Sequence, residues 1–491
     1  MTPGIILSIF AIYTLLVFVI GVITSRKAND ATFYTGNRQS PWYIVAYGMI
    51  GASLSGVTFL SEPGWVGSTQ FSYMMMVFGY VAGYAVVAGV LLPLYYRMNL
   101  TSIYTYLDER FGKYSYKTGA SFFILSRGVG SAMRMFAVVY ALDLFVFGHW
   151  GVPFWLTSLI FVLPILLYTY KGGIKTIVWT DLLQTTFMLL SVAISIYLIC
   201  KAMDWDFSGM LRQVKESEYS SLIVTDSLDR RFFLKQFFGG VFVVIAMTGL
   251  DQDMMQKNLS CRTLHDSQKN MISFGLILVV INFMFLLLGA VLYLYAEATG
   301  ITVTSPDNLF AEVAINRLGT IAGLVFVIGL ISAAYSSADG ALTALTTSFC
   351  IDILNLDKRL PESRKKRRIR YAVHCSFAFF FLLLIVGIKQ MDHKTIIDRF
   401  FTIAGYTYGP LLGLYGFGLF TRLKLRDRFV PLVAVASPAI TYILDVNSQQ
   451  WLGGYKFGYE LLLVNGLITF AGLYLCAKRR QAGKPAEEVG R

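Results

Sequence analysis

The sequence repeats one feature from end to end: apolar runs of about twenty residues, separated by short polar loops. An α-helix needs about 20 apolar residues to cross the hydrocarbon core of a bilayer. This rule predicts thirteen spans, near residues 3–24, 41–62, 72–96, 117–147, 152–170, 175–200, 235–256, 270–296, 319–348, 370–389, 397–420, 428–445 and 457–477. Only 14% of the 491 residues are charged, whereas a soluble domain has about a quarter. Both observations indicate an all-α polytopic membrane protein.

The loops indicate how the chain is oriented, because Lys and Arg are concentrated in every second loop, the positive-inside pattern of membrane proteins. The basic residues counted on this side are Arg26, Lys27, Arg38, Arg97, Arg110, Lys113, Lys171, Lys175, Lys257, Arg262, Lys269, Lys358, the run RKKRRIR (364–370), Arg422, Lys424, Arg426, Arg428, Lys478, Arg479 and Arg480. With thirteen spans, this pattern places the N-terminus outside and the C-terminus in the cytoplasm, in the cell membrane. We interpret RKKRRIR as a solvated loop near anionic headgroups.

The same pattern limits the function classes. The net charge of +13 follows from the basic loops, so we expect no nucleic acid, and no obligate protein partner is evident. The five cysteines and four histidines are scattered, without the spacing of a disulfide frame or a metal site. No Walker sequence is present. The sequence also lacks the cluster of acidic, Cys and His residues that an enzyme would need. We therefore expect a transporter that draws its energy from a gradient.

Three predicted spans contain small or helix-breaking residues. They are MIGASLSGVTFLSEPGW (49–65), FFGGVFVVIAMTGLDQDMMQKNL (237–259) and FFTIAGYTYGPLLGLYGFGLF (400–420). Irregular backbone in a membrane is tolerated only where protein buries it or it lines a cavity, and broken helices mark the sites of secondary transporters. Small residues also allow close helix packing. We expect a site within 41–62, and packing or a hinge within 400–420.

Ionisable side chains inside a membrane are costly, so each one is a candidate functional residue. Five lie within the predicted spans: Arg127, Arg134, Asp143, Asp181 and Asp339. Glu62 lies at the outer end of its span, where we expect it to contact water.

The stretch SAAYSSADGALTALTTSF (332–349) places a carboxylate among small and hydroxyl residues on an otherwise apolar helix. Ser336 lies one helical turn from Asp339 and Gly340. Hydroxyls, a carboxylate and freed carbonyls suit a hard cation, here sodium or a proton, and Asp181 could supply a second carboxylate. The alternative is that the serines bond to their own helix and Asp339 reaches the cytoplasmic headgroups.

Four passages resemble the solute:sodium symporter family and occur in the family's order. They are YRMNLTSIYTYLDERFG (96–112), YKGGIKTIVWTDLLQ (170–184), LDQDMMQKNLS (250–260) and AAYSSADGALTALTTSFCIDIL (333–354). The resemblance implies the leucine-transporter fold, with two inverted repeats of five helices, one extra helix before them and two after. It divides the chain into an N-terminal helix and loop (1–40), the first repeat (41–200), an extracytoplasmic loop (201–234), the second repeat (235–420), and two helices with a polar tail (421–491).

The resemblance also implies a main sodium site between a broken helix and the span of 319–348. On the matching positions, it consists of the carbonyls of Gly51, Leu54 and Ala333 with the hydroxyls of Ser336 and Ser337.

A second cation site, present in some relatives, falls on Asp181, Ser336, Asp339 and Gly340. Asp181 matches the family pattern, whereas Asp339 and Gly340 stand where hydroxyls are usual. Asp339 could strengthen this site, bind a proton in place of the ion, or pair with a cationic substrate.

The implied solute contacts are Ser53, Ser55, Thr58, Tyr73, Val77 and Arg134. Arg134 resembles the arginine that holds the carboxylate in sialic acid transporters, and a guanidinium offers two donors to such a group. The alternative is a structural pair with an acid or a carbonyl. Tyr73, Val77 and Met247 depart from the sialic acid or sugar patterns, which weakens both of those assignments.

These implications predict a secondary active transporter that carries a small organic solute into the cell together with sodium, by alternating access. Sodium is the expected bound ion, and we favour an acidic solute, a carboxylate or a sialic-acid-like molecule. The alternatives are a sugar or amino-acid symporter of the same fold, proton coupling through Asp339 and, more remotely, an ion channel, for which no filter-like segment is visible.

Overall fold

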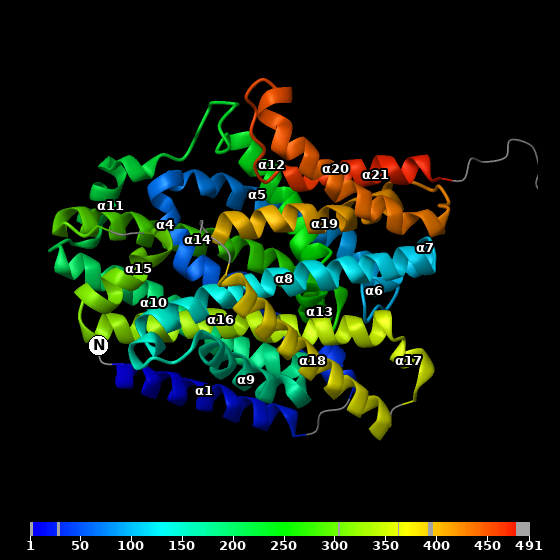
Figure 1. The fold of residues 1–491 in the computed structure, drawn as a ribbon, viewed down its shortest axis with the longest axis horizontal. Helices are drawn as coiled ribbons and strands as arrows, with labels where there is room; N and C mark the ends of the chain where they lie inside the picture. The colour runs from blue at the N-terminus through cyan, green and yellow to red at the C-terminus, as the bar shows by residue number, and fades with distance from the viewer. Residues whose placement is uncertain (1–2, 27–29, 303–304, 362, 391–395, 478–491) are drawn as a thin grey trace, which may run out of the picture.

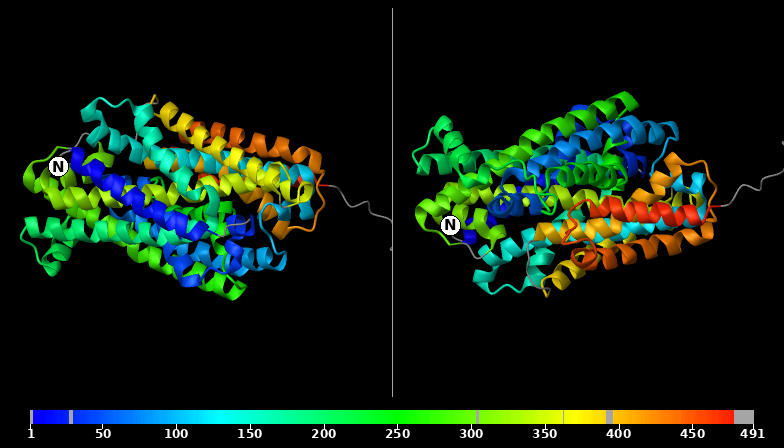
Figure 2. Two further views of the ribbon diagram at one scale, coloured as in Figure 1. Left: turned by 90° about the horizontal axis from the view of Figure 1, so that it is seen from below. Right: turned by 90° about the horizontal axis from the view of Figure 1, so that it is seen from above.

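The computed structural model describes residues 3–26, 30–302, 305–361, 363–390 and 396–477. Within these ranges the chain is almost entirely helical, with three isolated β-bridges and no strand. The long helices run along one axis of the molecule (Figures 1 and 2). This architecture confirms the predicted all-α class.

The first half of the chain contains α1 (Pro3–Ser25), α2 (Asp30–Thr35), α3 (Trp42–Ser53), α4 (Gly56–Thr69), α5 (Tyr73–Val86), α6 (Leu92–Arg97), α7 (Thr105–Arg110), α8 (Lys113–Phe145), α9 (Phe154–Gly172), α10 (Ile174–Ala202) and α11 (Phe207–Glu216). The second half contains α12 (Phe233–Val244), α13 (Gln252–Asn258), α14 (Leu264–Thr299), α15 (Leu309–Glu312), α16 (Thr320–Ser348), α17 (Leu356–Arg359), α18 (Arg364–Ile388), α19 (Ile396–Phe420), α20 (Val430–Trp451) and α21 (Leu461–Leu475). π-Helical turns extend four of these helices, at η3 (Val87–Leu91), η6 (Ile245–Gly249), η8 (Val313–Arg317) and η9 (Phe349–Ile353).

Helices occupy all thirteen predicted spans. Among the described residues, nine helices are by themselves long and apolar enough to cross a membrane, or ten if a bent pair counts as one span. One of the nine, Gly56–Arg97, runs through α4, α5 and α6, which the sequence divides between two predicted spans. The figure of thirteen crossings therefore stays a prediction.

Two helices are broken within the bundle. Between α3 and α4 the backbone leaves the helical region, with ψ of 95° at Leu54 and 177° at Ser55. Between η6 and α13 the axis bends by 71°. There the Asp251 carboxylate caps α13 by accepting hydrogen bonds from the backbone N–H groups of Asp253 (2.9 Å) and Met254 (3.3 Å). Both breaks leave backbone polar groups inside the bundle, as the site prediction for 41–62 requires.

The other glycines and the proline noted in the sequence allow helices to pack closely. Gly240 of α12 packs closely against the backbone of Met76. The Gly pair therefore serves packing, and the actual break comes ten residues later. The helix α19 continues through Pro410, and Gly409 and Gly413 lie against Asn465 and Thr469 of α21. Close packing therefore accounts for the small residues of 400–420.

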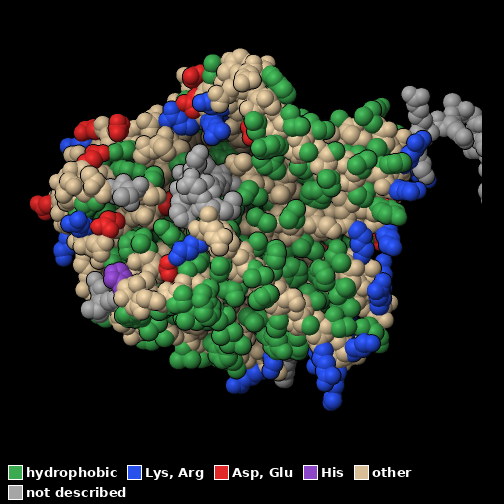
Figure 3. Space-filling model, viewed as in Figure 1, with side chains coloured by type: hydrophobic (Ala, Val, Ile, Leu, Met, Phe, Trp, Pro, Cys, Tyr) green, Lys and Arg blue, Asp and Glu red, His purple; other side chains and the backbone are tan. Residues whose placement is uncertain are grey.

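Surface charge differs between the two ends of the bundle. Figure 3 shows Lys and Arg gathered at the end near α7 and α17, and most of the acidic side chains at the end near α11. The helix α1 begins at the α11 end, and α21 ends at the opposite one (Figure 1). RKKRRIR is not a loop as predicted. It forms the first turns of α18, capped by Ser363, with Lys366 and Arg370 buried.

Candidate functional site

A cavity of about 90 Å³ lies beside the break between α3 and α4. Its wall includes Ser53, Leu54, Ser55, Thr58 and Tyr73, together with Arg127 and Arg134 of α8 and Met247, Thr248 and Asn282. The structure thus brings five of the six predicted solute contacts into one wall.

Val77 is the exception, and its role as a solute contact stays a prediction. It is fully buried and does not line the cavity. Val77 lies on the same face of α5 as Tyr73 and Tyr80, because residues three or four positions apart are neighbours on a helix. The hydroxyls of these two tyrosines meet at 2.9 Å, and both tyrosines line the cavity.

A wider cavity of about 300 Å³ adjoins the first and shares Val243, Met247 and Phe401 with it. The loop residues Asp229–Arg231 contribute to its wall, so it lies toward the end of the bundle that carries α11. Hydrogen bonds from Arg231 lower the pKa of the Asp229 carboxyl below its ordinary value. The wider cavity therefore extends from the solute cavity toward this end of the bundle.

The opposite side of the same region is closed by tyrosines. The hydroxyl of Tyr95 donates to the carbonyl of Gly249, and that of Tyr104 donates to the carbonyl of Leu250, each at 2.8 Å. These bonds hold the break before α13 against the segments around α6 and α7, which lie at the basic end of the bundle.

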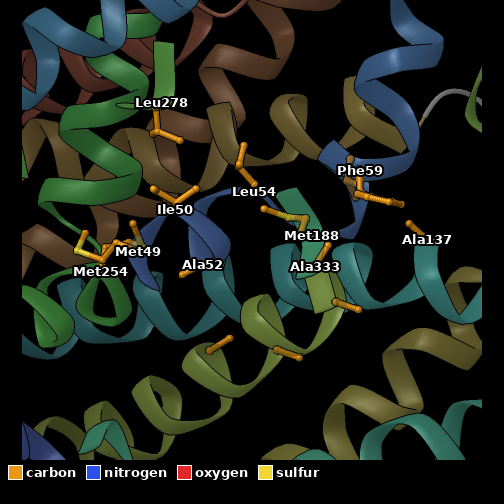
Figure 4. Close-up of a cluster of buried hydrophobic side chains, with 14 of the residues drawn as sticks. Met49, Ile50, Ala52, Leu54, Phe59, Ala137, Met188, Met254, Leu278 and Ala333 are labelled. Carbon is orange, nitrogen blue, oxygen red and sulfur yellow. The ribbon is translucent and has the colours of Figure 1, made fainter. Parts of the chain in front are cut away.

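The predicted main ion site lies where α3 packs against α10 and α16. The N–H of Gly51 donates to Thr185 Oγ1 (3.1 Å), and a Cβ on Gly51 would lie 2.8 Å from Ser336 Oγ. Figure 4 shows Leu54 at the break and Ala333 on the neighbouring α16. Only a glycine allows α3 to approach so closely.

The hydroxyls of Ser336 and Ser337 are buried and have no hydrogen-bond partner among the described residues. An unsatisfied buried hydroxyl costs about 1–3 kcal/mol, so these two oxygens are suited to an ion. Ser332, one turn earlier, instead donates to the Ile328 carbonyl at 2.7 Å. The alternative that Ser336 and Ser337 bond back to their own helix is therefore wrong.

Asp339 is also fully buried, so it does not reach the headgroups. Its carboxylate accepts hydrogen bonds from the Tyr168 hydroxyl (2.9 Å), the Thr180 hydroxyl (3.4 Å) and the N–H of Gly340 (2.6 Å).

The predicted second cation site holds a residue that the sequence interpretation placed elsewhere. Lys257, counted above as a cytoplasmic loop cation, is 1% exposed, and its Nζ lies 2.9 Å from Asp181 Oδ2. The bend before α13 turns this short helix into the bundle, which a hydropathy pattern does not reveal. The Asp253–Lys257 spacing of four residues, typical of a helical ion pair, is the signal that was available.

Arg127 and Arg134 line the cavity in different ways. Arg127 pairs with Asp253 and lies 3.6 Å from Asp251, whose carboxylate also accepts a hydrogen bond from the Tyr408 hydroxyl at 2.7 Å. The positive charge of Arg127 is thus compensated within the protein. Arg134 is 8% exposed and also borders a smaller cavity beside Tyr408.

The other two ionisable candidates do not line the cavity. Asp143 forms an ion pair with Lys389 at 2.9 Å near the end of α8. Glu62 is 1% exposed, so the expectation that it contacts water is wrong. The segment of η7 (Pro306–Asn308) and α15 packs over α4 and covers it, with Pro306 directly against Gly64.

Two broken helices around a buried polar cavity define a secondary transporter. Comparison with known proteins agrees: the model of the sodium:solute symporter family matches residues 33–424. The chain belongs to this family.

Individual relatives are distant. The sodium-dependent multivitamin transporter of Oryctolagus cuniculus is 27% identical over 77% of this chain, which spans 59% of that protein. The sodium/sialic acid symporter NanT of Aliivibrio fischeri is 24% identical over 90% of this chain and 87% of its own length. A solved structure of a Na⁺-coupled sialic acid symporter superposes with a TM-score of 0.80 at 19% identity, covering 96% of this chain and 99% of that one. The last comparison confirms the fold.

Proposed function

We propose that this protein carries a small acidic solute across the membrane together with sodium. The observation that carries the proposal is the position of Arg134, in the wall of a buried cavity that also contains the broken segment Ser53–Ser55. On the other side of that segment lie the unpartnered hydroxyls of Ser336 and Ser337. A cation site and an anion site thus share one stretch of irregular backbone.

The electrostatics of the cavity favour an anion. The charge of Arg127 is balanced by Asp251 and Asp253, and Arg134 is a second guanidinium in the same wall. A guanidinium binds a carboxylate through two parallel hydrogen bonds. Ser55 and Thr58 offer hydroxyls to the rest of the solute. The sialic acid substrate in the names of two relatives supports the same chemistry.

The coupling follows from the shared backbone. Sodium held by Ser336, Ser337 and the carbonyls of Gly51, Leu54 and Ala333 would join α3 to α16 and fix the shape of the cavity wall. A ligand shifts a conformational equilibrium only by its differential affinity for the two states. Sodium that binds the state open toward the α11 end therefore raises the affinity for the solute, and the solute raises the affinity for sodium by the same factor.

The solute is small. A cavity of about 90 Å³ is below the range of about 300–1,000 Å³ that encloses drug-sized ligands. A short carboxylate fills this space more readily than a nine-carbon sugar acid. A neutral sugar or amino acid is the second candidate, because most of the polar groups in the wall are uncharged.

The topology is part of the proposal. We infer inverted repeats at 41–200 and 235–420, because each begins with one of the two broken helices. The basic end of the bundle faces the cytoplasm by the positive-inside rule, which puts the N-terminus and the open cavity outside. Solute then enters from outside, and sodium leaves toward the low-sodium interior.

The test is the melting temperature of the purified protein in detergent, measured with sugars, amino acids, monocarboxylates and sialic acids, each with and without sodium. A ligand that binds only the folded state raises this temperature. We expect a shift from one acid that requires sodium and disappears in Arg134→Ala. A shift from a neutral solute that survives Arg134→Ala would refute the acidic solute, and the lack of any sodium effect would refute the coupling ion.

A further inference from the structure

The ion pair of Lys257 and Asp181 lies at the centre of the bundle, where two charges are costly unless they compensate one another. Nζ lies 2.9 Å from Asp181 Oδ2 and 3.8 Å from Asp253 Oδ1, and all three side chains are 1% exposed. At 2.9 Å the ammonium and the Asp181 carboxylate form a close ion pair inside the bundle. The ammonium is therefore held as a charge among carboxylates.

The helices around this pair pack closely at two glycines. A Cβ on Gly340 of α16 would lie 2.5 Å from Asp253 Oδ1, so the Asp253 carboxylate occupies the place where a side chain of residue 340 would extend. On the other side, a Cβ on Gly48 of α3 would lie 2.9 Å from the Asp181 Cβ. Glycines on two helices thus enclose the carboxylates and the ammonium.

Two further buried acids lie in this region: Asp251, which faces Arg127 and Tyr408, and Asp339, which is bound by other groups. Its oxygens accept from Tyr168, Thr180 and the N–H of Gly340. Lys257 is thus the cation that compensates Asp181, and it reaches Asp181 only because α13 bends inward at Asp251.

We propose that the ammonium of Lys257 is the resident cation of the site formed by Asp181 and Asp253 beside α16. It occupies the place that a second sodium ion would take, so the protein carries one sodium ion per cycle. A lysine ammonium is a compact point charge, and it cannot leave with the solute because it is tethered to α13. The stoichiometry rests on the proposed function, since it assumes that sodium binds at Ser336 and Ser337. The assignment of Lys257 as the resident cation does not rest on it.

The test is sodium titration of the melting temperature in detergent, with choline chloride keeping the ionic strength constant. Ser337→Ala, which weakens the main ion site, should lose most of the wild-type response. Ser337→Ala combined with Lys257→Ala should regain a saturable response, because Asp181 then lacks its cation. Saturating sodium at 100 times its Kd would favour the folded form about 100-fold. Adding Asp181→Asn as a third change should remove this response again.

Two results would overturn the proposal. One is a saturable sodium response in Ser337→Ala with Lys257 intact that Asp181→Asn abolishes, since sodium would then bind beside the lysine. The other is the absence of a regained response in the Ser337→Ala, Lys257→Ala protein.

A second variant tests the proposal if the Lys257→Ala protein does not fold. Lys257→Met with Asp181→Asn removes both charges together, and we expect it to titrate with sodium as the wild type does. A weaker sodium response of this neutral pair would show that Asp181 binds sodium in the wild type and would also overturn the proposal. A wild type without any sodium response would refute the proposed function alone, because the regained response in the Lys257→Ala protein can still be measured.

Discussion

Ser337→Ala separates an ion ligand from a structural serine, because the two roles predict opposite effects on stability. The Ser337 hydroxyl is buried on α16 without a hydrogen-bond partner among the described residues. Replacing a structural serine would break a bond and lower the stability. Replacing Ser337 removes an unsatisfied oxygen, so the protein without sodium should be as stable as the wild type or slightly more stable.

The expected magnitudes follow from the same geometry. Leaving a buried hydroxyl unpaired costs about 1–3 kcal/mol, so removing it should stabilise the sodium-free protein by up to that amount. A hydrogen-bonding group that contacts a charge contributes about 1.5–3 kcal/mol. If Ser337 contributes comparably to a bound sodium ion, its loss weakens sodium binding about 10- to 150-fold, since 1.4 kcal/mol corresponds to a factor of ten.

The assay is the melting temperature in detergent across a sodium series, with Ser332→Ala as the matched control. Ser332 lies on the same helix and is equally buried, but its hydroxyl donates to Ile328 at 2.7 Å. Ser332→Ala should lower the melting temperature slightly and leave the sodium midpoint unchanged. The reasoning is refuted if Ser337→Ala lowers the sodium-free melting temperature as Ser332→Ala does, or if it titrates with sodium like the wild type.

Three further predictions concern the solute, the proton and the outer loop. In uptake assays, Arg134→Ala should raise the KM for the acidic solute about 30- to 1,000-fold, because about 2–4 kcal/mol of charge-assisted hydrogen bonding is lost. Arg134→Lys should recover only part of this loss. An unchanged KM would make the arginine structural. Asp339→Asn should leave the sodium dependence and the pH profile of uptake unchanged, and a lost pH dependence would instead favour proton coupling. The pKa of Asp229 is lowered by Arg231, so the stability that this pair gives the loop is present above the ordinary Asp value of about 3.9 and is lost as the pH falls through the lowered pKa. Relative to the intrinsic exchange rate at each pH, the hydrogen-exchange protection of the loop should therefore fall only in strong acid. Asp229→Asn should show the lower protection at neutral pH as well, and equal protection of both proteins at neutral pH would contradict this.

The helices and the position of the solute cavity could be predicted from the sequence because both follow from local patterns. Apolar runs of fixed length give the helices. The small and hydroxyl residues around Leu54 give the break, since they can neither fill a core nor favour a continuous helix. Arg134 stood out because a charge in the middle of an apolar run requires a partner or a function.

Glu62 was placed wrongly because its surroundings come from a distant segment. Glu62 lies at the end of an apolar run, and such ends usually contact water. It is buried here because the segment after residue 305 folds back over α4, a contact between residues more than two hundred positions apart.

Lys257 shows what hydropathy and charge patterns leave undecided. A lysine at the end of an apolar run counts toward the positive-inside pattern whether its side chain points to the headgroups or into the protein. A buried carboxylate such as Asp181 requires a cation, but that requirement is met equally by sodium or by an ammonium from another helix. What decides between them is the direction of α13, which follows from the 71° bend and the cap at Asp251. The identity of the cation beside Asp181 is therefore a property of the backbone path.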